Sequence, residues 1–224
     1  MDMILTNQKM KDLLKFINSE KLDNFSHAIF DLDQTLYDYN ICNEKSVSSI
    51  VDFIEKNFGI DKKIVLKAYL EARKKINQDL KNTSSMHSRF LYLKKMSKTL
   101  SIKNPIQNTI KFYDIYWETF FERMELFDWV LPTFEQLKKK NIVIVIATDF
   151  NARLQFLKIK KLKIDSYITE IITSQEVGIE KPSQKFAQTV LSSTNSNCSK
   201  IFFVGDNLEK DKFLSNYGVK TFII

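Results

Sequence analysis

The sequence contains little of the residues that mark disulfide-rich, zinc-binding or membrane proteins. Its two cysteines, Cys42 and Cys198, and its two histidines, His27 and His87, are isolated in a chain of 224 residues, so neither a disulfide framework nor a zinc site is expected. The longest uninterrupted apolar run, residues 142–147, is too short to cross a bilayer. The first residues show no secretory signal pattern. We therefore expect a cytoplasmic protein that has no membrane partner.

Arginine is also scarce, and this bears on how the positive charge is interpreted. The chain has 34 basic and 27 acidic residues, a net charge of +7, but its arginines are limited to Arg73, Arg89, Arg123 and Arg153. Proteins that read nucleic acids favour the planar guanidinium fork, and no nucleic-acid-binding motif accompanies the lysines. The charge therefore favours a small anionic molecule, rather than a nucleic acid, as the partner. The sequence leaves the oligomeric state open between monomer and homodimer.

Glycine and proline leave few breaks in the chain, since there are only four glycines and three prolines. There is no internal repeat and no flexible linker. A short amphipathic helix that covers the core or a partner subunit is predicted within residues 3–19, and a buried strand follows at 27–33. Between residues 39 and 125 apolar residues recur at helical spacing without a strand pattern. This region is predicted to form a bundle of about four helices.

After Pro132 the pattern changes to helices that alternate with apolar strands. Nearly continuous β-branched strands separated by helices are typical of a parallel sheet covered on both faces. The predicted fold is therefore α/β, a Rossmann-like parallel sheet flanked by helices with an inserted all-helical domain. The segment 174–180 is interpreted as a loop. Helices are predicted at 133–140, 152–161 and 183–192, and strands at 142–147, 168–173, 201–206 and 219–224.

Polar side chains follow the predicted strands at their carboxyl ends, where parallel sheets bind ligands. Carboxylates from two strand ends can share one hard cation, and Mg²⁺ prefers oxygen ligands of this kind. Thr148, its neighbouring backbone amides and Lys181 would then offer hydrogen bonds and positive charge to a phosphate group. In chain order these residues are Asp31 and Asp33, Thr148 and Asp149, Lys181, and Asp206.

The two acids of the first strand have separable chemical roles. Asp31 can attack phosphorus and form an aspartyl-phosphate. Asp33 can protonate the leaving oxygen and later activate the attacking water. Each polar residue taken alone also fits a turn, a helix cap or a surface lysine, so the hypothesis depends on their joint order along the chain.

This order of residues resembles the four motifs of the haloacid dehalogenase superfamily of phosphohydrolases. The segment 31–36 (DLDQTL) is similar to the first motif, and Thr148 after an apolar strand is similar to the second. Lys181, in the sequence EKP, resembles the third motif, and the segment 205–211 (GDNLEKD) resembles the acidic fourth motif. Four motifs in the right order are a strong signal, whereas any one of them is weak.

The resemblance implies a role for each matching residue. It makes Asp31 the nucleophile and Asp33 the acid/base. It also implies that Asp31, the backbone carbonyl of Asp33 and Asp206 bind Mg²⁺. Asp211 would support the metal or its waters, or orient Lys181. The phosphate-binding residues that the resemblance implies are Thr148, Asp149 and Lys181.

The resemblance further implies a catalytic core made of two segments, 1–38 and 126–224, and a helical cap at 39–125 that chooses the substrate. The core carries an N-terminal helical extension, 1–24, which is longer than the family's usual lead-in, and the chain ends on its last predicted strand. From Asp38 to Glu125 there are 16 basic and 11 acidic residues, which suits an anionic substrate. The candidate substrate residues are Tyr37, Asp38, Arg89 and Asn151, with Lys94, Lys95 and Arg153 as further candidates.

The acid at Asp33 favours phosphate esters over haloacids, because the dehalogenase branch lacks an acid there and a leaving alkoxide needs a proton. The expected function is Mg²⁺-dependent hydrolysis of a small phosphorylated metabolite through an aspartyl-phosphate on Asp31. A phosphomutase of the same superfamily is the second hypothesis. A non-catalytic phosphate-binding or regulatory protein on this fold is the third, and a nucleic-acid-binding role comes last.

Overall fold

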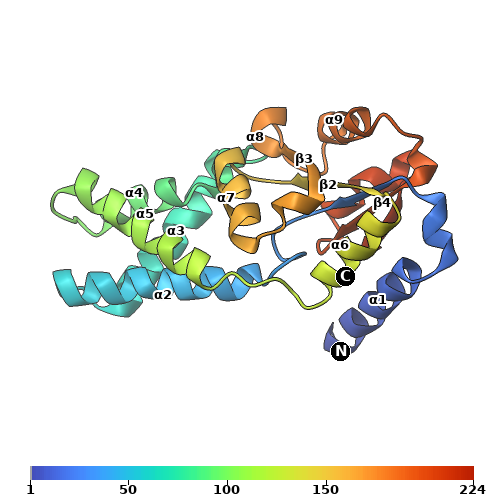
Figure 1. Ribbon diagram of the computed structural model, residues 1–224. Coiled ribbons are helices and arrows are strands. Elements are labelled where there is room, and N and C mark those ends of the chain that lie inside the picture. Colours follow the sequence, from blue (N-terminus) through green and yellow to red (C-terminus); the bar gives the residue numbers. More distant parts are fainter. Residues whose placement is uncertain (1) are drawn as a thin grey trace. The chain divides into compact units, whose positions relative to one another are not determined.

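The computed structural model describes residues 2–224, with side-chain environments from Gln8 onward (Figure 1). The chain divides into two compact units, one formed by Met1–Asp38 with Glu125–Ile224 and the other by Tyr39–Met124. Within the described part of the chain, no helix combines the length and the apolar character that crossing a membrane requires.

The first unit is built on a five-stranded sheet in which every pair of neighbouring strands is parallel. Its strands lie in the order β3-β2-β1-β4-β5, so the first strand of the sequence is central and its carboxyl end lies between those of β2 and β4. The predicted α/β fold with a parallel sheet is confirmed. The strands are β1 (His27–Phe30), β2 (Val143–Thr148), β3 (Ile168–Thr173), β4 (Ile201–Gly205) and β5 (Lys220–Ile223).

One face of the sheet is covered by α1 (Asp2–Ile17) and α6 (Val130–Lys139). The ring of Phe16 in α1 lies 5.2 Å from that of Phe202 in β4 and 4.9 Å from that of Phe222 in β5. Phe30 of β1 packs against Phe134 of α6 on the same face, with ring centroids 5.1 Å apart. Of the two predicted places for the N-terminal helix, on the core or on a partner subunit, the structure shows it on the core.

The opposite face packs against α9 (Gln184–Thr194) and the 3-10 helix η5 (Asp211–Tyr217). Successive strand residues point to opposite faces, so Phe202 meets α1 whereas Phe203 lies 5.3 Å from Phe213 in η5. Phe186 of α9 joins the same cluster. Both faces of the sheet are thus apolar and covered. The polar residues that follow the strands are left to form a site at the carboxyl ends of the strands.

The prediction of a loop at 174–180 is wrong for its first residues, because the short helix α8 (Ser174–Val177) begins there. A capping box begins this helix. The hydroxyl of Thr173 accepts a hydrogen bond from the backbone N–H of Glu176, and the Glu176 carboxylate accepts one from the backbone N–H of Thr173. One turn is too short to show helical periodicity in the sequence, which explains why the pattern missed it.

The second unit consists mainly of α2 (Tyr39–Phe58), α3 (Lys62–Asp79), α4 (Arg89–Thr99) and α5 (Pro105–Glu122). This is the inserted helical bundle that the spacing of apolar residues predicted. Arg89 is buried inside this unit among tyrosine rings. Its guanidinium donates to the hydroxyl of Tyr116 at 3.2 Å, to the hydroxyl of Tyr39 and to the backbone carbonyl of His87.

Candidate active site

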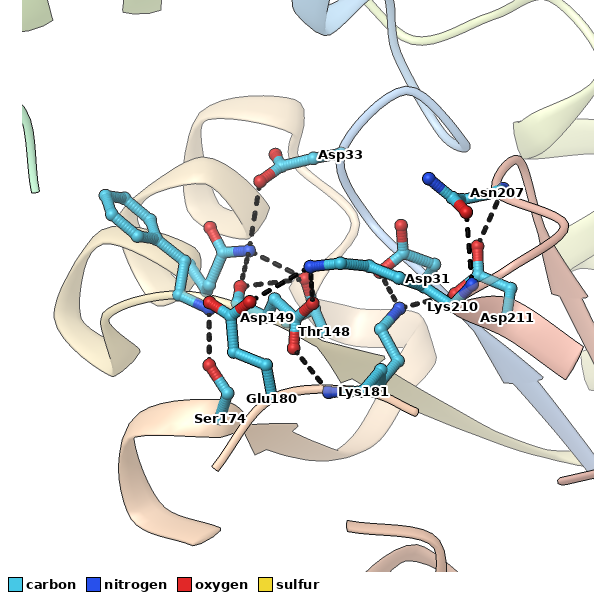
Figure 2. Close-up of polar contacts among 12 residues, drawn as sticks. Asp31, Asp33, Thr148, Asp149, Ser174, Glu180, Lys181, Asn207, Lys210 and Asp211 are labelled. Carbon is cyan, nitrogen blue, oxygen red and sulfur yellow. Dashed lines mark hydrogen bonds and ion pairs between the residues drawn. The ribbon is translucent and has the colours of Figure 1, made fainter. Parts of the chain in front are cut away.

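The carboxyl edge of the sheet in the first unit gathers polar residues from four segments of the chain (Figure 2). Asp31 directly follows the central strand β1, where its backbone N–H donates to the carbonyl of Val204 at 2.9 Å. Thr148 ends β2, and Asp206 follows β4. Because β1 is paired with both β2 and β4, the strand order itself brings these residues to one edge, as the sequence predicted.

Three carboxyl groups form a compact acidic cluster. Asp31, Asp206 and Asp211 each offer an oxygen, and these three oxygens lie within 4.8 Å of one another. Burial raises the pKa of Asp31 to about 8, with the charges of Asp211 and Asp206 adding to the rise and that of Lys181 opposing it. Burial and the charge of Asp211 raise the pKa of Asp206 to about 6. Carboxylate oxygens this close repel one another when they are ionised, and a bound cation would relieve the repulsion. The three carboxyl groups therefore fit a hard divalent cation such as Mg²⁺.

Asp211 reaches this cluster because residue 205 is a glycine. A Cβ atom placed on Gly205 would come within 2.8 Å of the Cβ of Asp211 and closer still to its carboxyl group. The buried carboxylate of Asp211 accepts from the backbone N–H of Asn207 at 3.0 Å and from Nζ of Lys181 at 2.6 Å. Asp211 thus contacts both Lys181 and the acidic cluster, and its predicted roles, to support the metal or to orient the lysine, stay predictions.

Lys181 is only 5% exposed and not a surface lysine. Its Nζ lies 2.8 Å from an oxygen of Asp31 and 2.6 Å from one of Asp211. Burial by itself would lower the pKa of Lys181, but the charges of Asp31, Asp211 and Asp149 raise it above its ordinary value. The ammonium group is therefore held in its charged form beside the candidate nucleophile.

The loop after β2 is tied to the loop that carries Lys181. One oxygen of Asp149 accepts the backbone N–H of Lys181 at 3.0 Å, and the other accepts Nζ of Lys210 at 2.8 Å. Lys210 also contacts the buried Glu180 at 3.0 Å. Thr148 is buried beside them and accepts a hydrogen bond on its hydroxyl from Gln155 at 2.7 Å. Side chains thus join the loop after β2, the loop that carries Lys181 and the segment that follows β4.

The candidate acid/base Asp33 is held by three side chains. Nζ of Lys158 lies 2.7 and 2.8 Å from its two carboxylate oxygens, the hydroxyl of Tyr37 donates to one of them, and the amide of Gln155 donates to the other at 3.3 Å. Burial would raise the pKa of Asp33, but the charge and hydrogen bonds of Lys158, with those of Tyr37 and Gln155, hold that pKa below its usual value.

Sequence reasoning missed Gln155, Lys158 and Lys210. Gln155 and Lys158 belong to α7 (Ala152–Leu162), where they share the buried face with apolar residues such as Leu154 and Ile159. Two polar residues in phase with the apolar face of a helix indicate buried polar contacts, and this was the signal that could have found them. Lys210 lies within the segment 205–211 that resembles the fourth motif, but the motif gave this lysine no role.

The candidate substrate residues occupy varied positions, and their roles stay predictions. Tyr37 is fully buried against Asp33. Asp38 is half-buried and is the last residue before α2. Asn151 caps α7 by accepting the backbone N–H of Leu154 at 3.2 Å. The three further candidates are less buried than Arg89: Lys94 and Arg153 are exposed, and Lys95 is half-buried.

Comparison with known proteins agrees with this geometry. The chain is 28% identical to ribulose-1,5-bisphosphate 5-phosphatase of Halopiger xanaduensis, over 82% of this chain and 77% of that protein. It is 26% identical to a glyceraldehyde 3-phosphate phosphatase of Pyrococcus furiosus, over 86% of this chain and 77% of the relative.

Solved structures and a family model agree as well. The fold is similar to that of a 2-haloacid dehalogenase from Pseudomonas syringae pv. Tomato, with a TM-score of 0.68 at 19% identity, over 88% of this chain and 85% of the other. A HAD phosphatase from Thermococcus onnurineus gives a TM-score of 0.62 at 18% identity with the same coverage. Residues 28–224 match the model of the family described as haloacid dehalogenase-like hydrolase. The chain therefore belongs to the haloacid dehalogenase-like hydrolase family, which confirms the resemblance that its four motifs showed and makes it an enzyme of the hydrolase class.

Proposed function

We propose that the protein is an Mg²⁺-dependent phosphatase that hydrolyses a small phosphorylated metabolite through an aspartyl-phosphate on Asp31. The observation that carries the proposal is the surroundings of Asp31. This carboxyl group ends the central strand, lies 2.8 Å from a buried ammonium group and belongs to a cluster of three carboxyl groups suited to a divalent cation. That the enzyme cleaves phosphoric monoesters is supported by the phosphatases among its relatives.

In the first step an oxygen of Asp31 attacks the phosphorus atom of the ester. A bond forms between this oxygen and phosphorus while the bond to the substrate's ester oxygen breaks. The leaving alkoxide takes a proton from Asp33, and this carboxyl group must first take up that proton from solvent, because Lys158, Tyr37 and Gln155 hold its pKa below the usual value. Asp31, the backbone carbonyl of Asp33 and Asp206, with the support of Asp211, would hold Mg²⁺, which would supply positive charge that offsets the charge of the phosphoryl group.

In the second step Asp33, now a carboxylate, takes a proton from water as the water oxygen attacks phosphorus. The bond between Asp31 and phosphorus breaks, and inorganic phosphate leaves. Throughout, Lys181 neutralises negative charge beside Asp31, and Thr148 offers its hydroxyl and neighbouring backbone amides to the phosphoryl oxygens. Phosphoryl transfer asks the protein mainly for such positioning and charge neutralisation.

The substrate class that we propose is a small phosphorylated sugar. Relatives named for ribulose-1,5-bisphosphate and glyceraldehyde 3-phosphate put short phosphosugars first among the candidates. The surplus of basic residues in the helical insert is consistent with an anionic substrate. Under this proposal neither a nucleic acid nor a membrane is a partner.

The experiment measures free phosphate released from a panel of phosphosugars, nucleotides and phosphorylated acids with Mg²⁺. Wild type is compared with Asp31→Asn, which keeps the size of the side chain but cannot attack, and with Asp165→Asn, an exposed control on the same unit. Release by wild type and the control, with none by Asp31→Asn, supports the proposal. An isomer of the substrate in place of free phosphate would show a mutase, and equal release by all three proteins would refute the role of Asp31.

A further inference from the structure

Helix α7 brings two buried polar side chains to the candidate acid/base, and the reaction described above gives neither of them a role. Lys158 is 1% exposed and Gln155 is 0% exposed. Burying a lysine is costly unless its charge is paired and hydrogen-bonded, so its place in the fold depends on the partner that it meets.

The partner that Lys158 meets in the site is the carboxyl group of Asp33. Nζ lies 2.7 Å from one carboxylate oxygen and 2.8 Å from the other, and it also lies 5.3 Å from the centre of the Phe150 ring. The ammonium group thus engages both oxygens of the carboxylate and restricts the rotation of that group. Asp33 itself is partly exposed, with 27% of its side chain accessible, so the buried lysine holds a carboxyl group that solvent can still reach.

Gln155 connects the same acid to the phosphate-binding loop. Its amide nitrogen lies 2.7 Å from the hydroxyl oxygen of Thr148, 2.9 Å from the backbone carbonyl of Asp149 and 3.3 Å from a carboxylate oxygen of Asp33. One side chain therefore fixes the distance between the group that handles the proton and the group that handles the phosphate.

Both residues are presented by a well-anchored helix. They are three positions apart, so they lie on one face of α7. The first turn of α7 is capped by Asn151, which accepts the N–H of Leu154, and by Gln175 of α8, which accepts the N–H of Ala152 at 2.8 Å. Side chains held on a rigid element fix catalytic geometry better than side chains on loops.

We propose that Lys158 and Gln155 are positioning residues of the phosphatase reaction: Lys158 orients the carboxyl group of Asp33 toward the ester oxygen, and Gln155 keeps Asp33 in register with Thr148. This inference rests on the proposed function. The two residues that hold the acid/base Asp33 in place belong to α7, which lies outside the segments that carry the four motifs.

The proposal makes the effect of a substitution depend on the leaving group. An alkyl phosphate needs a proton on its leaving oxygen, so misplacing Asp33 slows its cleavage. The p-nitrophenolate group of p-nitrophenyl phosphate, an aryl phosphate, leaves without taking up a proton. Misplacing Asp33 therefore slows formation of the phospho-enzyme less with this substrate than with an alkyl phosphate. Displacing the carboxyl group of Asp33 by about 1 Å is expected to lower the rate on the order of 100-fold. The loss cannot exceed the acceleration that an acid/base group contributes, which is about 10²- to 10⁴-fold.

The test uses Lys158→Met, which removes the charge at similar volume, and Gln155→Leu, which removes the amide. Lys161→Met, an exposed lysine of the same helix, is the matched control. We expect each site variant to lose roughly 10- to 100-fold in kcat on an alkyl phosphate with little change in KM. In rapid-mixing experiments, formation of the phospho-enzyme from p-nitrophenyl phosphate should fall clearly less than its formation from the alkyl phosphate. The control should match wild type.

A double-mutant cycle separates this role from a general effect on folding. Asp33→Asn with Lys158→Met removes both charges together, so it leaves no unpaired buried charge. If Lys158 acts through Asp33, the double variant is no slower than Asp33→Asn alone, and the two losses are far from additive. Additive losses, or a Lys158→Met rate equal to that of the control, would overturn the positioning role.

The failure of this inference is distinguishable from the failure of the proposed function. Wild type that releases no phosphate from any substrate, while folded, would refute the phosphatase itself and the positioning role with it. Wild type that is active and sensitive to Asp33→Asn, but insensitive to Lys158→Met and Gln155→Leu, would refute the positioning role alone. Thermal unfolding of every variant is recorded, and the double variant carries the test if Lys158→Met does not fold.

Discussion

Replacing Lys181 with methionine should destabilise the protein strongly when no metal is present. The ammonium group of Lys181 is the cation nearest to Asp31 and Asp211 in the described site, at 2.8 and 2.6 Å, and all three side chains are buried. Removing one partner of a buried ion pair leaves uncompensated charge and costs about 3–5 kcal/mol. In a domain of this size about 1 kcal/mol shifts the Tm by about 2–4 °C, so the Tm should fall by roughly 6–20 °C. The assay is thermal unfolding in EDTA, followed by circular dichroism.

Two controls make this result specific. Lys185→Met removes an exposed lysine on the neighbouring α9 and should change stability by less than about 0.5 kcal/mol. Adding Mg²⁺ should raise the Tm of Lys181→Met by more than it raises that of wild type, because the added cation restores charge to a site that has lost one. The reasoning is refuted if Lys181→Met unfolds within the range of Lys185→Met, since the buried carboxyl groups would then not need the lysine.

Three further outcomes are expected. Gly205→Ala should cost about 1–3 kcal/mol through overlap with Asp211 and should abolish most phosphate release; a Tm equal to that of wild type would contradict the overlap. Phe16→Ala should cost about 3–5 kcal/mol in denaturant unfolding, because this α1 ring packs on Phe202 and Phe222; a change within 1 kcal/mol would show that α1 is not part of the core. In EDTA, stability should fall as the pH rises from about 4 to 8, because the folded protein, in which the pKa of Asp31 is raised to about 8, keeps a proton that the unfolded chain has released. The slope is at most about 1.4 kcal/mol per pH unit for this group, and Asp31→Asn should flatten it.

The sequence predicted the arrangement of the sheet because its signals were strong and local. Runs such as residues 142–147 and 201–206 are nearly continuous in β-branched and aromatic residues, and such runs are typical of buried parallel strands. Ligands lie at the carboxyl ends of parallel strands, and this rule places Asp31, Thr148 and Asp206 at one edge because each of them follows or ends a predicted strand.

What the sequence could not predict depends on which side chains meet across long distances. Phe16 and Phe222 are at opposite ends of the chain, and nothing in the local pattern of α1 names the strands that it covers. Lys158 and Lys210 are two among thirty lysines, and most lysines are solvated, so composition favours an exposed position for each. Their pairing with acids becomes visible only when the loops are placed around the sheet.

Those pairings also explain why the function that we propose needs a metal ion although the chain as a whole is basic. Around the edge of the sheet, six carboxyl groups meet three lysine ammonium groups: Asp31, Asp33, Asp149, Glu180, Asp206 and Asp211 against Lys158, Lys181 and Lys210. With all of these groups ionised the site is strongly negative and would repel a phosphate ester. Burial raises the pKa values of Asp31 and Asp206, and the charge of Asp211 beside them adds to the rise. A divalent cation at Asp31, Asp206 and Asp211 would remove most of the excess at the point where the phosphoryl group must sit. The net charge of +7 acts only at long range, so the local balance of acids and lysines, more than the composition, decides whether an anionic substrate can bind.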